Sequence, residues 1–353
     1  MSFSRGWPGR LRRIRRVARL LTECLGLTPP VMSVAQAMAP SAPEGFKAAC
    51  IVSADLELNW AWQWARSGPQ RLAEAEQHSR RTRQNVPQIL RYSEQYGIPI
   101  TWATVGHLFL DSCARKDGRA HPDLPRLSHF ENEFWRFDGG DWFEDDPACW
   151  WEQAKGWYAP DLVRAILSGK TQHEIACHTF SHIDCRDGVC PPDVLRAEIA
   201  ECRRAAAPFG LALTSFVHPA HTIGNLPTLA ACGFASYRSD RDILGFAVDR
   251  GGIWELPSTA QIVWYEGLPA WAQRLRYIRI AQKAVATGRL CCFWFHPSDD
   301  SLLVDRILDP LFGHLQRESK AGRLWVGTAR AYCEFLAQRG AAIPSRTPRM
   351  GES

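Results

Sequence analysis

Short apolar runs of strand length recur along this chain, and each is followed by a stretch whose apolar residues have helical spacing. Phe46–Ala54 and Leu290–Phe295 lack regular polar alternation, which is typical of strands covered on both faces, as in parallel sheets. Further strands are predicted at Ile98–Val105, Glu174–Cys177, Leu213–Val217, Phe234–Tyr237, Ile253–Leu256 and Leu324–Val326. Seven or eight strands that alternate with helices predict parallel connections and a (β/α)7-8 barrel.

The predicted helices lie between these runs. The polar stretch Arg80–Tyr96 carries apolar residues at helical spacing and ends at Gly97, a residue type that favours helix C-termini. The other helices are predicted at Pro160–Leu167, Pro191–Ala206, Leu226–Ala231, Trp271–Ala286, Leu302–Gln316 and Ala329–Gln338. We therefore place one α/β domain at residues 45–340, with a disordered leader at 1–44 and a loose tail at 341–353.

The N-terminal leader resembles a signal peptide, because it is arginine-rich at its start and partly apolar afterwards. Glu23 and the pair Pro29 and Pro30 interrupt the apolar part, so we expect a disordered leader or an over-long start, with export as the alternative. No run of the sequence approaches the length of a membrane span. Twelve cysteines occur without a C-x-x-C pair, which favours reduced thiols in a cytoplasmic protein.

The net charge of +5 comes largely from arginines in the leader. No basic stripe interleaved with aromatic residues follows, so the sequence gives no support for nucleic-acid binding. We expect a small-molecule or sugar-conjugate substrate instead.

Ionisable side chains stand where most of the predicted strands end. In a parallel barrel, the residues just past the strand C-termini form the active site. These residues are Asp55, Glu57, His107, His178, His182, His218, His221, Arg238 and His296. His173 precedes its strand, so we expect it at the opposite barrel end as a surface residue.

Asp55 and Glu57 are separated by one residue at the end of a strand, so both side chains point to the same face. One can bind a metal while the other takes a proton from water. His178 and His182 are four residues apart, and one helical turn or an equivalent tight loop makes their rings converge on a divalent metal. Each motif alone also fits a solvated loop or helix, but together they favour a metal site.

His296 lies in the stretch F-W-F-H-P, where large apolar residues precede it and Pro297 follows it. An imidazole in such surroundings has a tuned pKa and can donate a proton to a leaving amine. The alternative is a core histidine with a backbone partner. In combination with the other strand-end residues, acid catalysis is the better interpretation.

Residues 108–157 interrupt the pattern with a segment rich in aromatic and acidic residues. Long irregular insertions often form lids or binding loops, and aromatic rings beside carboxylates suit sugars. We therefore include Trp151 and Trp157 among the candidate substrate-binding residues. A small satellite core of aromatic side chains is the equally favoured alternative.

These motifs resemble the polysaccharide deacetylase family (carbohydrate esterase family 4), in its branch with D-x-D/E in place of adjacent aspartates. The resemblance covers about Ala48 to Trp325, and H-T-F-S-H and F-W-F-H-P are its most specific parts. It implies a deformed (β/α)7-type barrel and a divalent metal, most commonly Zn²⁺. It assigns Asp55 as the catalytic base, His296 as the general acid, and the metal ligands Glu57, His178 and His182.

The third motif of the family departs from its usual form in this chain. The family has an arginine near a proline and a glycine that helps to orient the base, whereas Val217 to His221 keeps Pro219 and lacks the arginine. We expect His221 or Arg238 to replace it, and we include all three residues among the substrate-binding candidates. Glutamate at the metal position is a smaller departure, because its longer arm reaches the same point.

The resemblance implies a hydrolase that removes an N-acyl group, acetyl or formyl, from an amino sugar or sugar conjugate. An amidohydrolase of the purine-catabolic type, acting on a linear or cyclic amide, is the second interpretation. The third is an inactive carbohydrate-binding barrel, which would keep the fold but lose the metal or the base. The sequence shows neither loss.

Overall fold

A long buried strand forms the centre of the fold. The computed structural model describes residues 29–33, 41–65, 68, 70–127, 130–131, 136–137 and 140–339. Strand β1 (Ala48–Leu56) is buried along all nine residues. It pairs in parallel with β13 (Leu290–Phe295), with β14 (Leu324–Gly327) at its start and with β2 (Thr101–Thr104) at its end. An unbroken apolar run suits this position because neighbours cover both faces of the strand.

The main sheet is parallel almost throughout. Its hydrogen-bonded order is β10-β11-β9-β8-β7-β2-β1-β13-β12, with β14 attached to β1, and only the β10–β11 pair is antiparallel. The remaining strands of this sheet are β7 (Glu174–Cys177), β8 (Ser215–Val217), β9 (Ser236–Arg238), β10 (Val248–Asp249), β11 (Trp254–Leu256) and β12 (Ala260–Gln261). This curved α/β arrangement agrees with the predicted deformed barrel, although the ladder of described strands ends at β10 and β12 without joining them.

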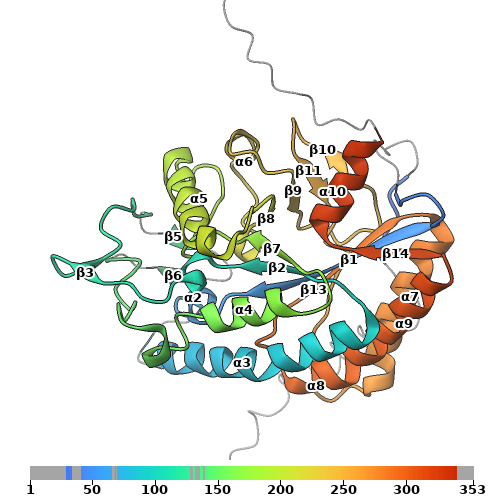
Figure 1. Cartoon of the computed structure of the whole chain (residues 1–353), viewed down its shortest axis with the longest axis horizontal. Helices are drawn as coiled ribbons and strands as arrows, with labels where there is room; N and C mark the ends of the chain where they lie inside the picture. Colours follow the sequence, from blue (N-terminus) through green and yellow to red (C-terminus); the bar gives the residue numbers. More distant parts are fainter. Residues whose placement is uncertain are drawn as a thin grey trace, which may run out of the picture.

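Helices cover the outside of the sheet, with α3 and α4 along one side and α7 and α9 beside them (Figure 1). The helices are α2 (Asn59–Trp62), α3 (Arg71–Tyr96), α4 (Pro160–Ser168), α5 (Pro192–Ala206), α6 (Leu226–Ala231), α7 (Ala270–Thr287), α8 (Ser301–Leu303), α9 (Asp309–Lys320) and α10 (Ala329–Gln338). Within the described part of the chain, no helix has the length and apolar character that crossing a membrane requires.

Two predicted helices differ from the structure. The helix predicted at Arg80–Tyr96 begins earlier, at Arg71. The prediction missed its first turns because they are polar and carry little apolar periodicity. The helix predicted at Leu302–Gln316 is divided by a π-helical turn at Val304–Leu308. Pro310 explains the division, since its ring clashes with the carbonyl four residues earlier and its nitrogen cannot donate. Most other elements lie within about two residues of their predicted bounds.

Part of the predicted leader packs against the domain. Residues 29–33 are described, and Met32 is buried and donates its backbone N–H to the carbonyl of Leu244. Arg289 donates from Nε to the carbonyl of Met32. These contacts tie residues 29–33 to the domain, and the disordered leader at 1–44 stays a prediction. The rest of the leader before residue 41, and the predicted tail at 341–353, lie outside the described residues.

The aromatic insertion contributes mainly to the core. Its short strands are β3 (Arg115–Lys116), β4 (Arg119–Ala120), β5 (Phe130–Glu131) and β6 (Arg136–Phe137). Phe137, Trp142, Phe143, Trp157 and Tyr158 are buried and continuous with the core of the sheet. For these side chains the alternative of an aromatic core holds, because their apolar surface is covered by protein rather than open to a ligand.

Candidate active site

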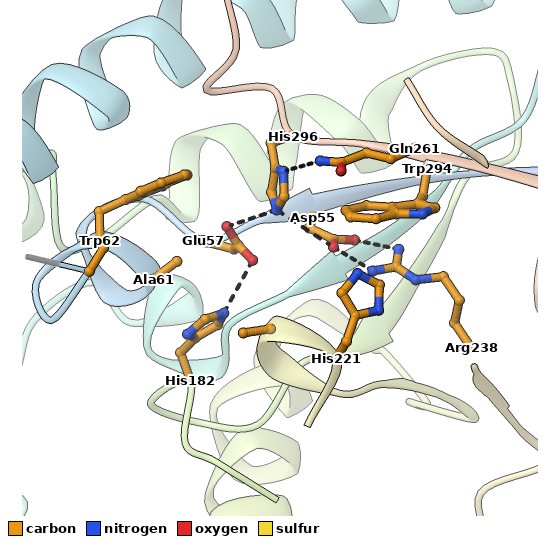
Figure 2. Close-up of a pocket in the computed structure, with 12 residues that line it drawn as sticks. Asp55, Glu57, Ala61, Trp62, His182, His221, Arg238, Gln261, Trp294 and His296 are labelled. Carbon is orange, nitrogen blue, oxygen red and sulfur yellow. Dashed lines mark hydrogen bonds and ion pairs between the residues drawn. The ribbon is translucent and has the colours of Figure 1, made fainter. Parts of the chain in front are cut away.

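A small cavity opens at the C-terminal ends of the parallel strands. Its volume is about 270 Å³. Figure 2 shows Glu57 between His182 and His296, and Asp55 between His296 and Arg238. The lining residues are Asp55, Glu57, Ala61, Trp62, Ala65, His182, Ala220, His221, Arg238, Gln261, Trp294 and His296. Polar strand-end residues from separate parts of the sequence thus meet in one place, as parallel topology requires.

Glu57, His178 and His182 form a buried group with metal-ligand chemistry. Oε1 of Glu57 lies 3.1 Å from Nε2 of His178 and 3.1 Å from Nε2 of His182. The other ring nitrogen of His178, Nδ1, lies 2.7 Å from the carbonyl of Val217. A carbonyl only accepts, so Nδ1 carries a proton, and Nε2 is the ring atom that points at the carboxylate and is available to a metal. Two imidazole nitrogens and a carboxylate oxygen that converge in a buried site fit a shared cation.

The two histidines are held by a loop rather than by a helix turn. Thr179 and His182 have positive φ angles of 57° and 62°, so the tight-loop alternative is correct. Glu198 from α5 fixes the loop, because both the backbone N–H and the hydroxyl of Ser181 donate to its carboxylate at 2.8 Å. Strained non-glycine backbone in this position requires such support from the surrounding structure.

We expect Glu198→Ala to weaken the loop that carries both histidines. The change leaves two buried donors of Ser181 without an acceptor, at a cost of about 1–3 kcal/mol in the free energy of unfolding. Metal affinity should fall by roughly 10–100-fold, as for other groups that orient ligands. Urea unfolding and metal titration measure the two effects. Glu201→Ala, three residues along the same helix, is the matched control, and equal losses in both variants would contradict this role for Glu198.

Asp55 is held by a bidentate arginine. Nη1 and Nη2 of Arg238 donate to Oδ1 and Oδ2 of Asp55 at 2.7 and 2.5 Å, and Nη1 also donates to the hydroxyl of Ser53. Burial raises the pKa of Asp55, but the charge and hydrogen bonds of Arg238 outweigh burial and hold that pKa below its ordinary value. Asp55 is therefore ionised and oriented, as a general base must be.

Arg238 lies beside the start of the third motif. Strands β8 and β9 are parallel neighbours, and their register sets Val217 directly beside Arg238. The neighbouring strand thus carries a guanidinium at the level where the motif begins, and its replacement of the family's arginine stays a prediction. The guanidinium carbon also lies 4.7 Å from the ring centre of Trp294, which holds its plane against the carboxylate.

His296 faces both carboxylates from the end of β13. Its Nε2 lies 3.6 Å from Oε2 of Glu57 and 4.0 Å from Oδ2 of Asp55. Burial lowers the pKa of His296, but the charges of Glu57 and Asp55 outweigh it and raise that pKa above its ordinary value. The ring is 24% exposed, and Gln261 lies 3.4 Å from its Nδ1. A protonated imidazole that reaches the cavity is suited to act as an acid.

The remaining substrate-binding candidates do not all reach the cavity. His221 lines the cavity, and burial and Arg238 lower its pKa to about 4. Pro219 is buried beside it without lining the cavity. Trp151 and Trp157 also lie outside the lining; Trp157 packs its ring edge against Trp60. Substrate contact by these two tryptophans stays a prediction, and the cavity gives it no support.

Three other histidines lie outside the cavity. His218 is buried, and its Nε2 lies 3.0 Å from the carbonyl of Gly224, which indicates a structural role. His107 belongs to a separate cluster with residues of the insertion. His173 directly precedes β7, as predicted, and accepts the backbone N–H of Ile100 at 3.1 Å; it is partly buried and therefore less exposed than expected.

Sequence reasoning missed Trp62, Gln261, Trp294 and Glu198. Trp294 was detectable, because it lies near the end of β13, two residues before His296, and side chains two residues apart along an extended segment point to the same face. Trp62 follows closely after Glu57 in W-A-W. Gln261 and Glu198 have no local signal, since nothing near them in the sequence indicates which loop they meet.

Comparison with known proteins supports this description of the fold. No protein-family model matches the sequence, and no curated protein matches it significantly. A structure from Mycobacterium smegmatis, described as a polysaccharide deacetylase, is 16% identical, covers 93% of this chain and 100% of its own, and has a TM-score of 0.57. One from Pseudomonas aeruginosa PAO1, described likewise, is 12% identical, covers 85% and 94%, and has a TM-score of 0.58.

A third similar structure is the Puue allantoinase, which is 14% identical, covers 87% of this chain and 95% of its own, and has a TM-score of 0.58. The chain therefore has the fold of the polysaccharide deacetylases, as its motifs predicted. Its assignment to the D-x-D/E branch of that family stays a prediction.

Proposed function

We propose that this protein is a metal-dependent hydrolase that removes an N-acyl group, acetyl or formyl, from an amino sugar or sugar conjugate. One observation carries the proposal: an arginine-held carboxylate, a partly exposed histidine and two members of a buried Glu-His-His group line one cavity, with His178, the third member, directly behind it. Glu57, His178 and His182 would hold the cation. When bound, a cation such as Zn²⁺ polarises an acyl carbonyl and lowers the pKa of its water toward about 7.

The protein's own residues supply the proton transfers. Asp55, kept ionised by Arg238, takes the proton of the attacking water. His296, which lies on the side of Glu57 away from His182, gives a proton to the departing amine. Trp62 and Trp294 line the cavity with apolar ring surface, which suits the apolar face of a sugar ring.

His296→Gln should separate leaving-group protonation from the rest of catalysis. For an amide substrate we expect kcat/KM to fall by about 10²-fold, at the lower end for acid catalysis because the part-exposed ring can be replaced by water. For an activated aryl ester the loss should be much smaller, since its leaving group needs no proton. Steady-state kinetics on both substrates measure the difference. Equal losses on both would assign His296 a role other than that of the acid.

A second candidate is an amidohydrolase acting on a small linear or cyclic amide. The cavity of about 270 Å³ is near the lower limit for ligand sites and suits a compact substrate. The similar fold of an allantoinase agrees with this class of reaction.

Turnover of a substrate panel tests the proposal, followed as released amine for the amino sugars and as newly formed carboxylate for the ureides. The zinc-loaded protein is assayed with N-acetyl and N-formyl amino sugars and with linear and cyclic ureides, before and after chelation. Chelator-sensitive turnover of the amino sugars supports the proposal, and turnover confined to the ureides selects the second candidate. Binding of sugars without turnover of any substrate would reject both and favour an inactive binding barrel.

A further inference from the structure

A second group of metal-binding side chains lies in the insertion, outside the cavity. It consists of His107, Cys113, His121 and Asp146, which we call the His107 cluster. Oδ2 of Asp146 lies 3.0 Å from Nε2 of His107, 3.1 Å from Nε2 of His121 and 3.3 Å from Sγ of Cys113. The two Nε2 atoms are 3.1 Å apart. Two imidazole nitrogens and one thiol sulfur therefore converge on a single carboxylate oxygen.

The arrangement places the ligand atoms where a cation can replace hydrogen bonds. Nδ1 of His107 lies 3.1 Å from the carbonyl of Trp157, which only accepts, so Nδ1 carries a proton and Nε2 is the ring atom available to a metal. This Nε2 faces both a carboxylate oxygen and a second imidazole nitrogen. His107 and Asp146 are fully buried, and a charged carboxylate in such a place requires cationic or hydrogen-bonding partners. His178 and Glu57 show the same arrangement in the active site.

The distances are close to the edges of a tetrahedral zinc site. Bonds of about 2.0–2.1 Å to nitrogen or oxygen and about 2.3 Å to sulfur set neighbouring ligand atoms roughly 3.3–3.6 Å apart. Four ligand pairs of the cluster are separated by 3.0–3.3 Å, slightly less than these edges, and all four ligand atoms lie within 4.8 Å of one another. Two histidines, a cysteine and an aspartate are ligand types that zinc accepts.

A supporting layer orients the ligands. Oδ1 of Asp146 accepts from the hydroxyl of Tyr158 at 3.1 Å and from the backbone N–H of Ala148 at 2.9 Å, which leaves Oδ2 turned toward the other three residues. The carbonyl of Trp157 fixes His107. Such outer hydrogen bonds are typical of metal sites, where they set ring tautomers and carboxylate orientation.

We propose that His107, Cys113, His121 and Asp146 bind a structural Zn²⁺ ion that is separate from the active-site metal. Four protein ligands close the coordination shell and leave no position for substrate, which distinguishes it from a catalytic site. The ion joins the end of β2 to three loops of the insertion. The backbone N–H groups of Gly106 and His107 donate to the carbonyls of Thr179 and Phe180, so the site also supports the loop that carries His178 and His182.

Cobalt substitution tests the proposal, because only the His107 cluster contains a thiolate ligand. The purified full chain is stripped with a chelator, reloaded with Co²⁺ and measured for bound metal and absorption. We expect about two ions per wild-type chain and a near-ultraviolet thiolate-to-cobalt charge-transfer band. His178→Ala should lose about one ion and keep the band. Cys113→Ser should lose the band, and the matched control Cys149→Ser should keep it.

Each alternative outcome overturns the proposal. Cobalt-loaded wild-type protein without the charge-transfer band excludes the cysteine ligand, and this result requires no variant to fold. A band that persists in Cys113→Ser and disappears in Cys149→Ser assigns the metal to another thiol. Since the spectra are recorded without substrate, failure here is distinguishable from failure of the proposed hydrolase function, on which this site does not depend.

Discussion

Replacing Asp55 with asparagine should reduce kcat/KM for the N-acyl substrate by about 10²–10⁴-fold, the range typical of lost general-base catalysis. The amide keeps nearly the same shape and still contacts Arg238, but it cannot take a proton from water. Because Glu57, His178 and His182 are unchanged, the bound metal should remain. Steady-state kinetics and metal analysis of the same preparation measure both quantities.

The control for this variant is Asp240→Asn, which removes an exposed acidic charge close in sequence to Arg238. Its kinetics should match those of the wild type. Full activity in Asp55→Asn would remove the assignment of Asp55 as the base. Loss of the metal together with activity would instead assign Asp55 to the metal site.

Arg238→Met should both destabilise the fold and change the pH dependence of catalysis. Removal of one partner from a buried ion pair costs about 3–5 kcal/mol, because Asp55 is left charged and uncompensated. Arg238 is 8% exposed and Asp55 is 4% exposed, so little solvent can replace the lost contacts. Burial raises the pKa of Asp55, and loss of the guanidinium removes the largest influences that lower it, so that pKa rises. The acidic limb of the pH–rate profile should therefore move to higher pH.

The sign of the stability effect follows from the same pKa. In the wild type, folding depresses the pKa of Asp55. The stability that the ionised carboxylate contributes is therefore present above its pKa in the unfolded chain, and it is lost as pH falls through its pKa in the folded protein. In Arg238→Met, protonation of Asp55 at low pH removes the unpaired charge. The difference in unfolding free energy between the two proteins should accordingly shrink toward acidic pH, as urea unfolding at several pH values measures.

Arg241→Met is the matched control for this variant. Arg241 lies three residues further on, is 42% exposed and pairs with Glu255, so its loss should cost under about 1 kcal/mol. An acidic limb that stays in place in Arg238→Met would show that the bidentate pair does not set the pKa of the base.

The sequence by itself determined the succession of strands and helices and the identity of most polar residues at the strand ends. Apolar runs such as Ala48–Leu56 and Leu290–Phe295 are local signals, because a strand buried on both faces needs apolar residues throughout. Parallel topology then brings strand C-termini to one edge. Asp55, Glu57, His182 and His296 were predicted to meet there for this reason, and they line one cavity.

Only the tertiary structure decided which distant residues complete each site. Arg238 meets Asp55 across 183 residues because the curved sheet turns the end of β9 toward the end of β1, although β8, β7 and β2 lie between them. His107 has the same local signal as the active-site histidines, yet its ring joins Cys113, His121 and Asp146 from the insertion. Sequence periodicity records how each segment is buried, whereas these pairings depend on loop paths and strand register, which arise only when the segments pack together.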